Sequence, residues 1–261
     1  MPKPKIKPDT IDARTLADLL MADLIPKVYV PAKHVRAQKD LLRQRLWLVS
    51  IRTMVKNRIH HILDRNHVVA HHSDTFGKAG REELNQVDIA APDDLLLKAH
   101  LEILDHIQAQ IGHSEQWIHE AVCGNPRVAT LRTTPGLGKV LAALVAMEID
   151  DVHRFASPGK LCAYAGLVPT TYASGGKVRH GRLLPSCNRW LRWAYVEAAW
   201  IAQRTSPYCH TYFERVKRRK GANSAATALA RRLCEITWHC LNDNRPYEER
   251  AVPAAFCSSW S

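Results

Sequence analysis

Residues 131–140 read LRTTPGLGKV, and this stretch predicts a helix-hairpin-helix. Gly136 and Gly138 allow a tight turn after Pro135, and the free backbone amides beyond the turn open a second helix. Such a helix start can bind a phosphate without reading a base, and Lys139 adds positive charge there. An ordinary turn between two helices explains the same residues. We therefore expect a compact helical domain around this turn, with Gly136, Gly138 and Lys139 as candidate phosphate contacts.

Further along the chain, residues 171–182 read TYASGGKVRHGR and place a small hydroxyl among glycines and cations. A serine hydroxyl is a poor nucleophile at neutral pH, so it needs an approachable backbone, a proton acceptor and positive charge for the oxyanion. Gly175 and Gly176 leave the backbone beside Ser174 open. The cations that would hold the charge are Lys177, Arg179 and Arg182. Ser174 is thus a candidate nucleophile towards a phosphodiester; a polar turn between two elements is the alternative.

Three helices are predicted after this segment. Residues 188–202 carry a stripe of aromatic residues, which favours core packing over a platform for stacked bases. Arg189, near the start of that helix, is a further candidate phosphate contact. A second helix ends in the cationic run at residues 215–221, and a third, residues 225–241, is rich in small residues that allow close packing.

Two long helices are predicted upstream of the hairpin. From Val35 to about Leu63, apolar residues recur every three or four positions among many cations, which is typical of a basic amphipathic helix. We expect this helix to contact a nucleic-acid backbone. An imperfect coiled-coil seam follows, made of Leu97, Leu101, Leu104, Ile111, Ile118 and Val122. The two helices can pack as an antiparallel hairpin or mediate dimerisation, and the seam serves either arrangement.

Composition supports a nucleic-acid partner. The 261 residues include 37 Lys and Arg against 25 Asp and Glu, a net charge of +12, which favours a polyanion. None of the seven cysteines forms a Cys-x-x-Cys pair, so neither a disulfide framework nor a zinc knuckle is indicated. No apolar run is long enough to span a membrane and no signal peptide is recognisable, so we expect a soluble cytoplasmic protein without a membrane partner.

Several short motifs occur in one order along the chain. They are residues 7–14 (KPDTIDAR), the Pro-Gly-Leu-Gly turn, 155–157 (FAS), 163–169 (AYAGLVP), Ser174-Gly175, and 188–192 (NRWLR). On these motifs, the chain resembles the DEDD-type insertion-sequence transposases, the bridge-RNA-guided serine recombinases of bacterial mobile elements. The resemblance covers nearly the whole chain.

The resemblance implies a RuvC-like, ribonuclease-H-like domain with four metal-binding carboxylates, then a coiled coil, then a C-terminal transposase domain with the serine. Asp9 and Asp12 match the last two carboxylates, and their spacing of three residues puts both on one helix face, where they can share Mg²⁺. Asp9 as an N-cap with Asp12 in the first turn is an equally sound structural interpretation. Nothing before Lys3 supplies the first two ligands. The sequence therefore resembles an N-terminally truncated transposase that binds Mg²⁺ weakly or not at all.

By resemblance, the reaction is DNA strand cleavage and rejoining through Ser174, with Asp9 and Asp12 as metal ligands. A guide RNA and a homo-oligomer formed through the coiled coil are the implied partners. Relatives often have a Lys and a Gly where this chain has Pro185 and Cys187, so contacts made by that lysine are not expected here. One alternative is a catalytically inactive nucleic-acid-binding remnant; another, a metal nuclease, would leave Ser174 unexplained.

Together these patterns predict a mainly α fold in four parts. Residues 1–34 are the remnant of a RuvC-like domain, 35–123 the long helices and coiled coil, and 124–250 the C-terminal transposase domain with the helix-hairpin-helix and the serine. Residues 251–261 are a tail.

Overall fold

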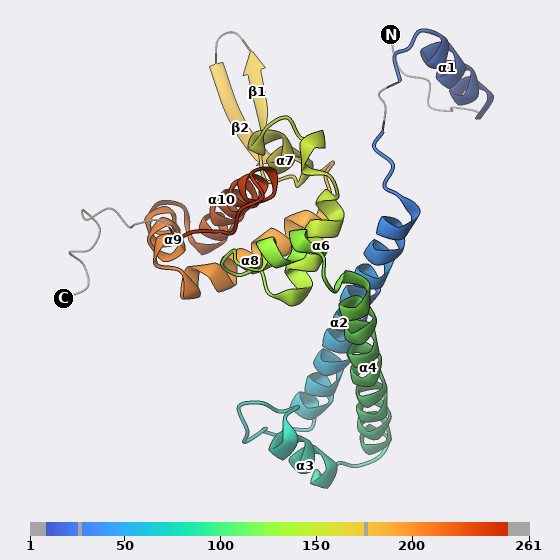
Figure 1. Ribbon diagram of the computed structural model, residues 1–261. Helices are drawn as coiled ribbons and strands as arrows, with labels where there is room; N and C mark the ends of the chain where they lie inside the picture. The colour runs from blue at the N-terminus through green and yellow to red at the C-terminus, as the bar shows by residue number, and fades with distance from the viewer. Residues whose placement is uncertain (1–8, 26–27, 175–176, 250–261) are drawn as a thin grey trace, which may run out of the picture. The chain divides into compact units, whose positions relative to one another are not determined.

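The computed structural model describes residues 9–25, 28–174 and 177–249, without the side chains of Asp9, Thr10 and residues 172–180 (Figure 1). The described residues are mainly helical, as predicted. The chain divides into two compact units, residues 1–33 and 34–261. The finer division at residues 123 and 250 and the RuvC-like origin of the first unit stay predictions. Among the described residues, no helix is both long and apolar enough to cross a membrane.

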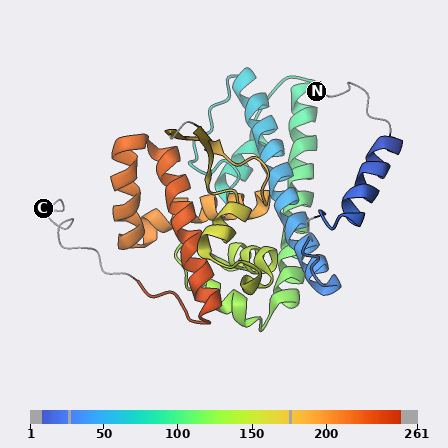
Figure 2. The ribbon, with the colours of Figure 1, turned by 90° about the horizontal axis from the view of Figure 1, so that it is seen from above.

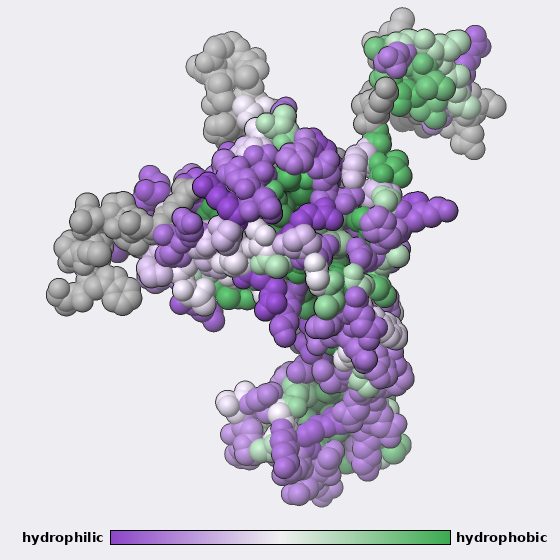
Figure 3. All heavy atoms as spheres, viewed as in Figure 1, coloured by the Kyte–Doolittle hydropathy of each residue, from purple (hydrophilic) through white to green (hydrophobic). Residues whose placement is uncertain are grey.

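The first unit contains one helix, α1 (Asp9–Met21). All its described side chains are exposed, including those of Ile11, Leu16 and Leu20. Figure 3 shows apolar side chains gathered on the visible face of this helix. Large apolar residues exposed together on one short helix indicate a contact surface. No described residue of this unit covers it.

Two long helices, α2 (Lys33–Arg65) and α4 (Asp93–Val122), run antiparallel and side by side (Figures 1 and 2). Leu48 of α2 packs with Ile107 and Ile111 of α4, and the predicted seam is buried here except for half-buried Val122. The helix α3 (Lys78–Gln86) packs on one end of the pair through Leu84. The seam therefore serves the hairpin within the chain.

Most cations of α2 are engaged by other parts of the protein. Lys39 and Arg43 pair with Glu148, Arg45 pairs with Glu115 at 2.6 Å, and the Lys56 ammonium lies 4.5 Å from the ring centroid of Phe76. The contact of α2 with a nucleic-acid backbone stays a prediction, and it would use the cations of this helix that are not engaged in this way. Lys39 and Glu148 lie 109 residues apart in sequence, so the amphipathic pattern of α2 alone could not reveal these pairs.

The C-terminal region surrounds a buried helix. Its helical elements are α5 (Pro126–Leu131), α6 (Lys139–Ile149), a 3₁₀ turn (Val152–Arg154), α7 (Pro158–Tyr164), α8 (Arg189–Thr205), α9 (Pro207–Lys220) and α10 (Ala222–Asn242). Every residue of α6 from Ala142 to Ile149 is buried, because that helix is apolar on almost all sides. The long α10 packs against α7, α8 and α9.

The cysteines of this core are free thiols. Cys162, Cys209, Cys234 and Cys240 are buried, and burial raises the pKa of the last three because a thiolate is poorly solvated there. Buried thiols with a raised pKa are weakly reactive, which indicates that these three cysteines are structural.

The two glycines of the α5–α6 turn, which looked equivalent in the sequence, have different surroundings. Gly136 has a φ of +81° and lies so close to α8 that a Cβ would clash with the Ala198 carbonyl. Gly138 is the N-cap of α6 with a φ of −67°, and a Cβ there would meet nothing within 4 Å. Gly136 is therefore required for packing, whereas Gly138 lies at an open helix start.

Replacing each glycine by alanine should separate these roles. We expect Gly136→Ala to lower the free energy of unfolding by about 2–3 kcal/mol, since it combines a strained φ with an overlap against backbone. Gly138→Ala should change it by less than about 1 kcal/mol. Urea unfolding followed by circular dichroism measures both, and equal losses would contradict the packing role of Gly136.

The hairpin of β1 (Pro169–Ser174) and β2 (Lys177–Leu183) was not predicted. Its antiparallel register pairs Ser174 with Lys177 and Tyr172 with Arg179, after an irregularity between Pro169 and Thr171. The run of Thr, Tyr and Val residues suits strands, and a proline is tolerated at a strand start.

Candidate functional site

Ser174 is the last residue of β1, and its backbone is paired with that of Lys177. Gly175 and Gly176, which we expected to open the backbone beside it, lie outside the described residues, as do the side chains of Ser174, Lys177 and Arg179. Figure 1 shows the two strands projecting from the helices around α7. The backbone of Ser174 is thus near the outer end of a projecting hairpin.

The register sets which residues of the hairpin are neighbours. Directly opposed residues of an antiparallel pair belong to one face of the ladder, and so do alternate residues of a strand. Ser174 and Lys177 therefore share a face with Tyr172 and Arg179. Arg182, near the other end of β2, is exposed, and its carbonyl accepts a hydrogen bond of 3.0 Å from the Thr170 hydroxyl. The backbone thus places two of the three candidate cations beside the candidate nucleophile.

A buried ionic network holds the start of α8, just beyond the hairpin. The Glu148 carboxylate is 1% exposed and accepts hydrogen bonds from Arg43 at 2.7 Å and from the Asn188 amide at 2.9 Å. The Lys39 ammonium lies 3.7 Å away. The Asn188 side chain also accepts from the backbone amides of Trp190 and Leu191, which caps α8.

The same region closes the base of the hairpin. The Arg192 guanidinium of α8 donates to the Leu184 carbonyl, and the amide of Leu184 donates to the carbonyl of Val168 at 3.2 Å. Gly166, with a φ of +67°, lies against Arg192 and Cys187, leaving no room for a Cβ. The network and these contacts connect α2, α6 and α8 with the segment that leads into and out of the hairpin.

Sequence reasoning missed Glu148 and its partners. The visible signal was one carboxylate inside the otherwise apolar run of α6, because such a group is retained in a core only when it is paired. Its partners on α2 could not be identified without the fold.

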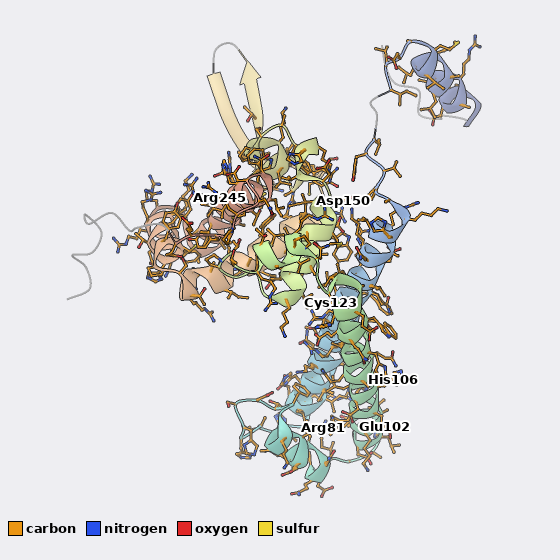
Figure 4. All side chains as sticks on the ribbon, in the orientation of Figure 1. Arg81, Glu102, His106, Cys123, Asp150 and Arg245 are labelled. Carbon is orange, nitrogen blue, oxygen red and sulfur yellow. The ribbon has the colours of Figure 1, made fainter. Side chains whose placement is uncertain are left out.

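The remaining candidates are spread over three elements. Lys139 is exposed at the start of α6, and Arg189 is exposed as the first residue of α8. Gly138 is exposed beside Lys139, whereas Gly136 is packed against α8. Near the opposite end of α6, Asp150, labelled in Figure 4, pairs with Arg127 at 3.5 Å. The exposed residues, but not Gly136, are available to a ligand.

Asp9 and Asp12 occupy the first turn of α1. Asp12 is exposed, and the side chain of Asp9 lies outside the described residues. Carboxylate oxygens are the donors that Mg²⁺ prefers, so the chemistry fits, but α1 supplies only two of the several ligands that such an ion needs. Within the described ranges, no three His, Cys, Asp or Glu side chains lie together as metal ligands.

Comparison with known proteins finds transposase families in two separate stretches of the chain. Residues 1–68 match a family of DEDD transposases of the IS110 type, and residues 128–214 match the transposase family IS116/IS110/IS902. The chain is 27% identical over 260 residues to a probable family 20 transposase of Pseudomonas aeruginosa, covering 94% of this chain and 76% of that protein.

Two further relatives are longer than the matched region. An uncharacterized 43.6 kDa protein of insertion element IS110 from Streptomyces coelicolor is 30% identical over 163 residues, which is 62% of this chain and 40% of that protein. An uncharacterized 42 kDa protein of IS900 from Mycobacterium paratuberculosis is 32% identical over 155 residues, 57% of this chain and 38% of the relative. The chain therefore aligns with about two fifths of the length of these two relatives.

Proposed function

We propose that this chain, by family a DNA transposase of the IS110/IS116 type, cleaves and rejoins DNA strands with Ser174 as its nucleophile. The observation that carries the proposal is the hairpin register, which pairs Ser174 with Lys177 at the end of a projecting strand. A nucleophile on such a projection can reach a strand of duplex DNA without the helical core having to approach it.

The chemistry is nucleophilic catalysis at phosphorus. The Ser174 oxygen forms a bond to phosphorus, its proton is lost, and the bond from phosphorus to one strand oxygen breaks as that oxygen takes up a proton. The phosphoserine link conserves the bond energy, so the hydroxyl of another strand end can attack it and release the serine. Lys177 and Arg179 stabilise the negative charge that develops on the phosphate oxygens.

Asp9 and Asp12 would hold a divalent cation such as Mg²⁺, whose charge would favour the same transition state. Gly138, Lys139, Arg182 and Arg189 would hold neighbouring phosphates and position the duplex. Gly136 would contribute through the shape of the α5–α6 turn, because its packing against α8 fixes the start of α6.

A guide RNA and a homo-oligomer belong to the same proposal, and they rest on the resemblance. The seam of α4 is largely buried against α2. An oligomer would therefore use a surface other than this seam.

Binding of duplex DNA through phosphates tests the first requirement. We expect the affinity to fall about a hundredfold between about 50 mM and about 200 mM salt, the loss expected for about four phosphate contacts. Fluorescence anisotropy with a labelled duplex measures it. A dissociation constant independent of salt would contradict binding through phosphates.

A further inference from the structure

The last turns of α9 carry a dense group of exposed cations, the α9 cation cluster: Arg215, Lys217, Arg218, Arg219 and Lys220. Lys217 pairs with Glu214 at 2.8 Å, and the Arg215 guanidinium lies 5.2 Å from the ring centroid of Tyr212. The charge of Arg218 contributes to lowering the pKa of Glu214, after the larger effect of Lys217. Within the described part of the chain, no ion pair or hydrogen bond is seen for Arg219 and Lys220, so these two charges in particular are available to a ligand.

This cluster is balanced only in part by acidic residues of its own helix. From Glu214 to Lys220, α9 holds five cations against one carboxylate, while Arg231 and Arg232 of α10 pair with Glu235. Arg215 and Arg219 are four residues apart on one helix, a spacing at which like charges cost a few tenths of a kcal/mol. The helix dipole favours a positive charge in the last turn, but this effect is screened and does not require five cations. The repulsion among these cations is unfavourable in the free protein, and a bound polyanion would relieve it.

The geometry excludes one small anion as the ligand. Successive helical residues are rotated by about 100°, so residues 217–220 point in different directions around the helix and cannot converge on a single phosphate. All four are nevertheless exposed. They can contact several phosphates of an extended polymer.

The surface next to the cluster is open to a wide ligand. A Cβ at Gly221 would meet nothing within 4 Å, and residues 222–228 at the start of α10 are only Ala, Asn, Ser and Thr. Within described residues 202–249, no large apolar side chain is exposed, so the surface lacks the apolar anchors of a membrane-binding helix. Exposed cations without apolar anchors fit a nucleic-acid duplex, which is rigid and evenly charged, better than a lipid surface.

The α9 cation cluster is also separate from the site proposed above. None of the candidate site residues lies on α9, and Figures 1 and 2 both place α9 at the end of the C-terminal region away from α2 and α4. Its charges are available, whereas those of α2 are largely engaged within the chain.

We propose that the α9 cation cluster is a second, sequence-independent contact for the phosphate backbone of duplex DNA. The proposal rests on the proposed function for its class of ligand. It assigns to α9 the binding of the duplex outside the cleaved position, so that the DNA is held at two places on the C-terminal region.

The test compares two triple variants that remove the same charge. One carries Arg218→Gln, Arg219→Gln and Lys220→Gln; the control carries Lys33→Gln, Lys78→Gln and Lys98→Gln, three exposed lysines of the N-terminal half. Affinity for a duplex of unrelated sequence is measured over a series of salt concentrations. The α9 variant should bind at least about tenfold more weakly, with a log–log salt slope smaller by about 2–3 because each lost phosphate contact removes about 0.9. The control should keep nearly the wild-type slope.

Further arms decide between explanations. A variant with Arg218→Lys and Arg219→Lys keeps the charge and should bind like the wild type; a loss there would overturn the electrostatic account. Equal weakening of duplex binding in both triple variants would also overturn it. So would an α9 triple variant that binds duplex DNA like the wild type but no longer binds structured RNA or phosphatidylserine vesicles. The inference and the proposed function can fail separately. If the wild type forms a Ser174-dependent adduct but the α9 triple variant binds duplex DNA as well as the control variant does, only this inference is contradicted. If the α9 triple variant loses duplex affinity but the wild type forms no such adduct, only the proposed function is contradicted.

Discussion

Ser174→Ala is expected to abolish a covalent protein–DNA adduct while leaving DNA affinity and the unfolding midpoint unchanged. The substitution removes the attacking oxygen and no other group, and one hydroxyl at a strand end contributes little to stability. The assay traps labelled DNA on the protein and resolves the adduct on a denaturing gel with Mg²⁺ present. It is run on the chain itself.

Two controls accompany this prediction. Ser224→Ala removes an exposed hydroxyl of α10 and should leave the adduct intact. Asp12→Ala should abolish it, because the transition state loses a carboxylate that would hold the cation. An adduct that persists after Ser174→Ala would assign the nucleophile elsewhere.

Removing the buried carboxylate of α6 should have the largest effect on stability. Glu148→Ala leaves the Lys39 ammonium, whose side chain is 8% exposed, without its carboxylate and deprives Arg43 and Asn188 of their acceptor. Breaking a buried pair in this way costs about 3–5 kcal/mol of the free energy of unfolding, because one charge stays buried and uncompensated. Urea unfolding at neutral pH measures the change.

The matched control is a glutamate that pairs with α2 at the surface. Glu115 bonds Arg45 at 2.6 Å, but its side chain is 47% exposed, so Glu115→Ala should cost less than about 1 kcal/mol. Adding Lys39→Met to Glu148→Leu should recover part of the lost stability, since it removes the stranded charge. Similar losses for Glu115→Ala and Glu148→Ala would show that burial of the network is not what stabilises this junction.

Periodic patterns predicted the fold well, because they report burial directly. The seven-residue spacing of Leu97, Leu104, Ile111 and Ile118 predicted a seam, and these side chains are buried. The Pro-Gly-Leu-Gly turn was also placed correctly between two helices. Its two glycines looked equivalent, and only the fold shows that Gly136 is fixed by the backbone of α8.

Features that depend on distant residues were not predictable in the same way. The cations of α2 look solvent-facing in sequence, yet Arg43 bonds Glu148 over a separation of 105 residues. The β-hairpin has a local sequence signal, a Gly-Gly pair between Thr- and Val-containing segments, but the same residues also fit a reactive turn. That hairpin gives Ser174 its place at a strand end beside Lys177.

The central claim is that the Ser174 oxygen forms the bond to phosphorus, and peptide mapping of the trapped adduct tests it most directly. After nuclease trimming and proteolysis, mass spectrometry of the nucleotide-carrying peptide should place the phosphodiester remnant on Ser174, with unmodified Thr170 and Thr171 in the same strand. A remnant on any other residue, or an adduct without a phosphoserine link, would contradict the account.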